Sequence, residues 1–114
     1  MPSGESQLFD VEEFWKFDMR VGLVKEAERV PRTRKLIKLL VDFGGEERVV
    51  VAGIGNQYGP EDLKGKRMIF VTNLKYKRIA GIESQAMLLV AEDNSGRVHL
   101  ITVDESVPLG AKVW

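Results

Sequence analysis

Three basic side chains stand within four positions in the second half of the chain, and a tyrosine stands among them. They are Lys75, Lys77 and Arg78, with Tyr76 between the two lysines. Lysine and arginine bind phosphate groups by charge, and an aromatic ring can stack on a nucleobase. These residue types at this spacing are those of a surface that holds an anionic ligand, although charges in a surface loop can also be simply solvated.

A second basic cluster lies earlier in the chain, at the joint between two expected strands. It contains Arg29, Arg32, Arg34 and Lys35. The segment from Leu63 to Ile82 has six basic residues and no acidic one, whereas the whole chain has 17 of each. Charge that is segregated in this way favours one positive face on a protein of zero net charge.

The groups that catalysis needs are scarce in this sequence. There is no cysteine, and the single histidine, His99, lies in an alternating run that places it on the solvent side of a strand. No pair of carboxylates has the spacing of an acid–base site, and no His, Cys and Asp cluster has that of a metal site. Residues 53–55 begin like a phosphate-binding loop, but that pattern fails at Tyr58. We therefore expect a binding protein without enzymatic activity, metal or cofactor.

The apolar segments are too short to cross a membrane. None approaches the roughly 18 to 20 residues that a spanning helix needs. The first residues are polar and acidic, unlike a secretory leader, and the lack of cysteine fits a reducing compartment. We expect a cytoplasmic protein without membrane contact, with a flexible N-terminus at residues 1–8 and one domain at residues 9–114.

The elements that must position the basic clusters are short strands with little helix. Asp10 and Glu13 have the spacing of an N-terminal capping box, which predicts a short helix there. Strands are expected at 19–30, 35–42, 48–54, 66–73, 87–91 and 97–103, with a helical turn at 60–63. This order indicates an all-β, five-stranded oligonucleotide-binding (OB) barrel with short terminal extensions, and an SH3-like barrel is the alternative. In an OB barrel the loop between the first two strands, which here carries the second basic cluster, lies near the ligand-binding face.

A series of motifs resembles the tRNA-binding domain that is appended to methionyl-tRNA synthetases. The same domain also occurs in free-standing dimeric tRNA-binding proteins and in endothelial-monocyte-activating cytokine precursors. The similar motifs are Phe17–Gly22, Lys35-Leu36, Val41–Gly44, Val51–Ile54, Tyr58, Pro60–Leu63, Gly65-Lys66, Asn73–Lys75 and Gly81–Ala91. The resemblance covers nearly the whole chain and implies an OB barrel that recognises tRNA by shape, with no enzymatic activity of its own. The loop at residues 30–36 departs from the family pattern, because arginines replace a histidine and an acid.

The resemblance and the charge clusters together define the candidate tRNA-binding residues. The resemblance implies such a role for Asn73, Lys75, Arg78, Ser84 and Met87. Ser84 and Met87 keep the family's Ser-x-x-Met spacing, although a place in the core is equally expected for Met87. Charge alone adds Lys77, Arg32, Arg34 and Lys35.

The resemblance also implies partners. It implies a homodimer that pairs through its terminal extensions, where Phe14, Trp15, Phe17, Leu109 and Trp114 lie. These side chains would otherwise close the core of the monomer. The expected ligand is tRNA, and the catalytic subunit of methionyl-tRNA synthetase is a further expected partner. The chain is then a synthetase beta subunit or a trans-acting tRNA-binding factor. The alternative is a CsaA-type secretion chaperone, a related dimer of the same fold that binds unfolded preproteins.

Overall fold

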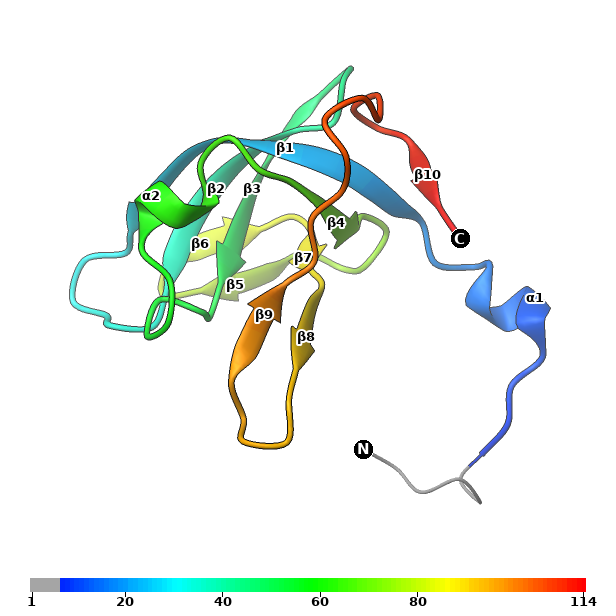
Figure 1. Cartoon of the computed structure of the whole chain (residues 1–114), viewed down its shortest axis with the longest axis horizontal. Coiled ribbons are helices and arrows are strands. Elements are labelled where there is room, and N and C mark those ends of the chain that lie inside the picture. Colours follow the sequence, from blue (N-terminus) through cyan, green and yellow to red (C-terminus); the bar gives the residue numbers. More distant parts are fainter. Residues whose placement is uncertain (1–6) are drawn as a thin grey trace.

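The computed structural model describes residues 7–114, and it shows a β barrel with helices of a single turn each (Figure 1). The expectation of a flexible N-terminus falls mainly on residues 1–6, which lie outside the described residues. In residues 7–114 no helix is long and apolar enough to cross a membrane.

The main sheet of the barrel follows a path of five strands, in the order β3-β2-β1-β4-β7, with β10 paired to β1. The bounds are β1 Met19–Arg29, β2 Ile37–Asp42, β3 Glu47–Ala52, β4 Arg67–Val71, β7 Met87–Leu88 and β10 Lys112–Val113. All of these pairs are antiparallel. The first half of β1 pairs with β4 and its second half with β2, and the register shifts between Val24 and Glu26. Such a bulge bends a strand, which lets one long strand serve both sides of a small barrel. The expected all-β, five-stranded barrel is confirmed.

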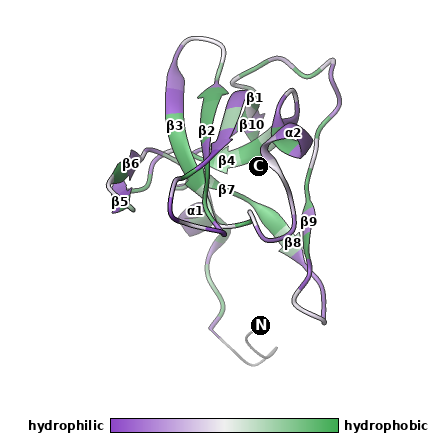
Figure 2. Cartoon of the chain, turned by 90° about the vertical axis from the view of Figure 1, so that its left-hand side faces the viewer, coloured by the Kyte–Doolittle hydropathy of each residue, from purple (hydrophilic) through white to green (hydrophobic). Residues whose placement is uncertain are grey.

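The remaining elements are two helical turns and two hairpins. They are α1 Val11–Phe14, α2 Pro60–Leu63, β5 Lys77–Ile79, β6 Ile82–Ser84, β8 Val90–Glu92 and β9 Val98–Leu100. The turn α2 lies between β3 and β4, as predicted. Asp10 is at the N-cap of α1, but its side chain makes no capping hydrogen bond, so the predicted capping box is wrong. Figure 2 shows the β5–β6 and β8–β9 hairpins projecting from different sides of the barrel.

The observed strands differ from the expected ones in two places. The strand expected at residues 87–91 is divided at Leu89, because residues 87–88 pair with β4 whereas residues 90–92 pair with β9. The β5–β6 hairpin was not expected as strands at all. The sequence does not indicate this pairing, because the strands are rich in charge and are joined by a turn of only two residues. The neighbouring wall of the barrel holds the pairing in place.

The barrel closes between β3 and residues 84–85 through a mixture of backbone and side-chain hydrogen bonds. The Gln85 amide donates to the Val49 carbonyl at 2.8 Å, and the Gln85 Oε1 accepts from the Val49 amide at 3.0 Å. The Ser84 Oγ accepts from the Val51 amide at 3.0 Å. Side chains thus satisfy donors of β3 that a neighbouring strand would otherwise satisfy.

The core lies inside the barrel and is closely packed. Its largest fully buried side chains are Val24, Ile37, Leu39, Val41, Val50, Leu63, Met68 and Phe70. The rings of Phe43 and Phe70 meet edge to face with centroids 5.5 Å apart. A Cβ atom on Gly22 of β1 would lie 2.8 Å from Phe43 Cε1, so the residue at this position must be glycine for the strand to pack on the rings.

Candidate nucleic-acid interface

The β5–β6 hairpin organises the basic residues around Tyr76. The hairpin turns at Ala80 and Gly81, whose φ angles of 50° and 82° are both left-handed. Two consecutive residues of this kind form the turn that matches the twist of a tight hairpin, and alanine adopts it at some cost. Since strand residues alternate, Lys77 and Ile79 share one face of β5 and Arg78 lies on the other.

Beneath this hairpin lies a cavity of about 260 Å³. Its apolar lining comes from Val51, Leu74, Ile79, Ala86 and Met87, and its polar lining from Lys75, Lys77 and Ser84. Four of the predicted tRNA-binding residues therefore meet at one place. The cavity itself was not predicted, because Val51 comes from β3 and only the closure of the barrel brings that strand beside the hairpin.

Ser84 shapes the cavity and also holds the barrel together. The side chain is buried, and its hydroxyl accepts from the Val51 amide and donates to the Ala86 carbonyl at 3.3 Å. Met87 is 47% exposed, so it lies outside the core. A contact of either side chain with tRNA stays a prediction.

Asn73 has both ends of its side-chain amide in use within the protein. Its Oδ1 accepts from the Asp18 amide, and its Nδ2 donates to the Lys16 carbonyl, each at 2.7 Å. The side chain thereby fixes the segment that leads from α1 into β1. The neighbouring Thr72 hydroxyl donates to Asp18 Oδ2 at 2.7 Å and is the main cause that lowers the pKa of this carboxyl below its ordinary value. A direct role of Asn73 toward RNA stays a prediction.

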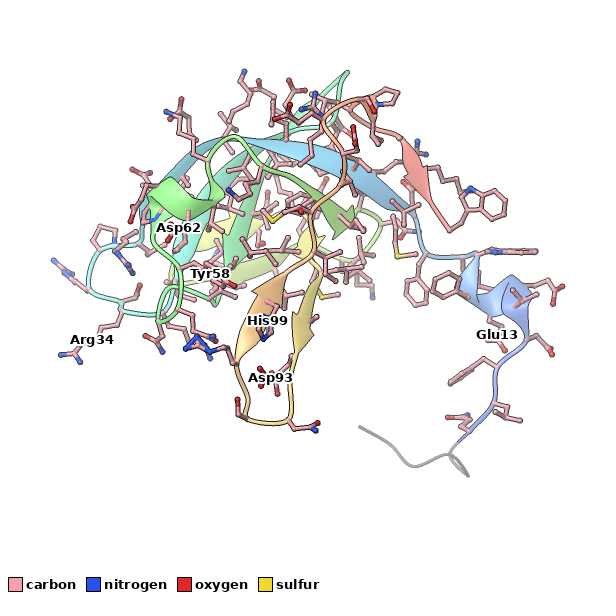
Figure 3. The ribbon with its side chains drawn as sticks, in the orientation of Figure 1. Glu13, Arg34, Tyr58, Asp62, Asp93 and His99 are labelled. Atoms are coloured by element: carbon pink, nitrogen blue, oxygen red, sulfur yellow. The ribbon has the colours of Figure 1, made fainter. Side chains whose placement is uncertain are left out.

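The loop between β1 and β2 presents the second basic cluster. Arg32 is exposed and has a left-handed φ of 67°. The Arg29 Nη1 donates to the carbonyls of Gly55 at 2.9 Å and Arg34 at 3.3 Å, so its guanidinium supports the loop from within. Arg32, Arg34 and Lys35 are exposed, and Figure 3 shows Arg34 extending away from the barrel.

The two basic clusters flank the same end of β3. Val51, near this end, lines the cavity under the hairpin. Two residues further on, a Cβ atom on Gly53 would lie 3.2 Å from Lys35 Cε, so the lysine stem passes directly over the chain. Residues that are far apart in sequence thus come together at one end of β3. The prediction that both clusters form one basic face requires this proximity.

Within residues 7–114, the cations of these clusters form no ion pairs with carboxylates. In the part of the chain that the structure describes, the ion pairs of lysine and arginine are Arg20–Asp18, Lys25–Glu47, Lys38–Glu28, Arg48–Glu46 and Lys64–Glu26. None of them includes Arg32, Arg34, Lys35, Lys75, Lys77 or Arg78. The nearest acid by pairing is Glu83, which stands opposite Arg78 in the hairpin register. Arg78 instead donates to the Gly81 carbonyl at 2.8 Å. Six cations therefore remain available to phosphate groups.

Elsewhere on the described surface, the polar side chains make contacts within the protein. His99 lies on the solvent side of β9, as predicted, with its Nε2 2.8 Å from Asp93 Oδ2 (Figure 3). The Ser95 hydroxyl, followed by His99, lowers the pKa of the Asp93 carboxyl. Among residues 7–114, no group of three or more His, Cys, Asp or Glu side chains has the arrangement of a metal site.

The side chains predicted to form a dimer interface lie mostly on the surface. Phe14, Trp15 and Phe17 are each about half exposed and Trp114 is 82% exposed, so they do not close the core. Leu109 is half-buried. Trp15 and Trp114 line one hollow with Lys112, so the segment after α1 and the C-terminal residues meet there. The dimer itself stays a prediction.

The sequence of this chain matches a known domain family and parts of larger ligases. The family model described as "Putative tRNA binding domain" matches residues 19–112. Methionine–tRNA ligases of Methanocaldococcus jannaschii and Thermotoga maritima are 48% and 46% identical over 104 and 111 residues. These matches cover 91% and 97% of this chain but only 16% and 18% of the ligases.

Two solved structures are similar over almost the whole chain. The crystal structure of a MetRS related protein from Pyrococcus horikoshii is 60% identical with a TM-score of 0.94, and the match covers 96% of this chain and 100% of that one. The chaperone CsaA from Bacillus anthracis is 33% identical with a TM-score of 0.84, over 95% and 100% of the two chains.

Proposed function

We propose that this chain, which belongs to the tRNA-binding domain family, binds folded tRNA mainly by charge and shape. The observation that carries this proposal is the set of six cations that have no carboxylate partner within residues 7–114 and lie on both sides of one end of β3. Electrostatic attraction to phosphates supplies much of the affinity of such surfaces, and double-stranded RNA is recognised mostly by its shape. The domain is non-catalytic in itself, although relatives that contain it are ligases.

The cellular role that fits this domain is to bring tRNA to a synthetase. The chain spans about a sixth of the methionine–tRNA ligases that it matches. We propose that it acts in the cytoplasm as a beta subunit of methionyl-tRNA synthetase or as a trans-acting tRNA-binding factor. The similarity to the MetRS related protein from Pyrococcus horikoshii, over 96% of this chain and 100% of that one, supports this role.

A homodimer is the proposed assembly. Its support is two hollows with exposed aromatic side chains, one lined by Trp15 and Trp114 and the other by Phe9, Phe14 and Phe17. Exposed clusters of aromatic side chains are typical of interaction surfaces. Two basic faces on one particle would also increase the effective concentration of each face for a large RNA.

A second candidate function is that of a chaperone for unfolded polypeptides. The similarity to the chaperone CsaA supports it, and so does the apolar lining of the cavity under the β5–β6 hairpin, which could take an aliphatic side chain. The available cations favour tRNA, because burial of apolar side chains does not require them.

The test of the proposal is a filter-binding titration of the purified protein with total tRNA at several salt concentrations. An unfolded polypeptide is added as a competitor. Binding that weakens steeply with salt and that the polypeptide does not displace supports the tRNA function. Weak tRNA binding together with saturable binding of the polypeptide would replace it with the chaperone function.

A further inference from the structure

We propose that the cavity under the β5–β6 hairpin takes a single unstacked nucleobase from a single-stranded part of the bound RNA, with the adjoining phosphates on Lys75 and Lys77. This inference rests on the proposed tRNA binding and adds to it a specific site and a class of ligand. It implies that the protein distinguishes RNA with unpaired nucleotides from a continuous duplex.

The size of the cavity suits one ring system. Pockets for whole small-molecule ligands have volumes of roughly 300–1,000 Å³. The cavity here has about 260 Å³, which is below that range and suits a planar base better than a whole nucleotide. The sugar and phosphate would therefore remain at the mouth, where the lysines lie.

The lining of the cavity has the chemistry of a surface for a base. Five of its eight lining residues are apolar, and Met87 presents a flexible thioether side chain that is 47% exposed. Methionine sulfur makes favourable contacts with aromatic rings. The Ser84 hydroxyl already accepts one hydrogen bond and donates another, so it offers little for reading the edge of a particular base. We therefore expect weak preference among the bases.

The charges at the rim favour RNA over an apolar peptide. Lys75 and Lys77 both line the cavity, and in residues 7–114 neither forms an ion pair with a carboxylate. An apolar floor with unpaired cations at its edge is the combination that single-stranded nucleic acids require, because each nucleotide offers both a ring and a phosphate. In a duplex, by contrast, the bases are stacked and cannot enter a cavity.

The experiment uses the full chain and three RNA probes of the same length. The first is a single strand with one 2-aminopurine, the second is the same strand with an abasic site in place of that base, and the third is a blunt duplex. We expect a saturable change in 2-aminopurine fluorescence and about tenfold weaker binding of the abasic strand, as for the loss of one stacked base. Equal affinity for the intact and abasic strands would overturn the proposal.

Two variants assign the effect to the cavity. Met87→Ala should weaken binding of the single strand at least about fivefold more than binding of the duplex. Tyr76→Ala is the matched control, because Tyr76 is 52% exposed and does not line the cavity. If Tyr76→Ala removes the base-dependent part and Met87→Ala does not, the base stacks on the tyrosine ring outside, and the proposal is wrong.

The remaining outcomes separate this inference from the proposed function. Binding of tRNA that is insensitive to the abasic site and to Met87→Ala retains the function and rejects the nucleobase site. Displacement of 2-aminopurine RNA by an unfolded polypeptide, together with poor binding of total tRNA, rejects both. Should Met87→Ala fail to fold, the comparison of intact with abasic RNA on the unmodified protein still decides the question.

Discussion

The salt dependence of tRNA binding offers the sharpest test of the basic face. The double variant Lys75→Ala/Lys77→Ala removes two cations that line one cavity and have no carboxylate partner in the described chain. Each phosphate contact contributes about 0.7 to 0.9 to the slope of log affinity against log salt concentration. Loss of both contacts should therefore reduce that slope by about 1.4 to 1.8.

The same numbers set the loss of affinity. The electrostatic part vanishes near 1 M salt, so at about 0.1 M the double variant should bind about 25- to 60-fold more weakly, or about 2 kcal/mol. Filter binding or fluorescence anisotropy with unfractionated tRNA, at four or more salt concentrations, measures both quantities.

A variant with the same change in net charge provides the control. Lys25 and Lys64 are exposed, and they form ion pairs with Glu47 and Glu26. The double variant Lys25→Ala/Lys64→Ala should leave the slope within about 0.5 of the unmodified protein, because those cations are already compensated. Equal reductions in the two double variants would mean that only net charge matters, and the assignment of the β5–β6 hairpin to the interface would be refuted.

Three further predictions concern the dimer, the closure of the barrel and the response to acid. Trp15→Ala should shift the protein toward monomer in analytical ultracentrifugation, and a variant that remains dimeric would place the interface elsewhere. Ser84→Ala should lower the free energy of unfolding by about 1–3 kcal/mol, measured by urea denaturation, because the buried Val51 amide loses its acceptor; an unchanged urea midpoint would show that this hydrogen bond is dispensable. The pKa of Asp18 is lowered, chiefly by the Thr72 hydroxyl, so the folded protein binds this proton less readily than the unfolded chain. This contribution to stability is present above the ordinary value of 3.8 and is lost as the pH falls below it. Thr72→Val should therefore flatten the decrease of unfolding free energy between about pH 5 and pH 2, and an unchanged profile would contradict the assigned cause.

Much of the barrel is determined by local sequence. The alternating and continuous runs of valine, leucine and isoleucine predict β1 to β4, because their side chains must alternate between core and surface or be buried on both faces. Pro60 predicts the start of α2, because its fixed φ angle suits the first turn of a helix. The β5–β6 hairpin escaped this reasoning, since its strands have three residues each and Ala80 is an unusual residue at a left-handed turn position.

The composition of the candidate site follows from the sequence as well, and its geometry does not. The residue types and their spacing indicated that Lys75, Lys77 and Arg78 bind an anion. The motifs that resemble the tRNA-binding domain family added Ser84 and Met87. No local pattern indicated that Asn73 would use its whole amide to hold the chain before β1, or that Ser84 would accept from a strand amide. Such partners lie more than 30 positions away in the chain, so only the closed barrel specifies them.

The sequence alone thus determined the class of the fold, the amount and location of positive charge, and the absence of cysteine. Each of these is a property of residue types or of short-range periodicity. The tertiary structure decided which cations of residues 7–114 have no carboxylate partner, that both basic clusters flank β3, and that an apolar cavity lies between Val51 and the hairpin. These features depend on contacts between distant segments, and such contacts exist only after the strands have paired and the barrel has closed.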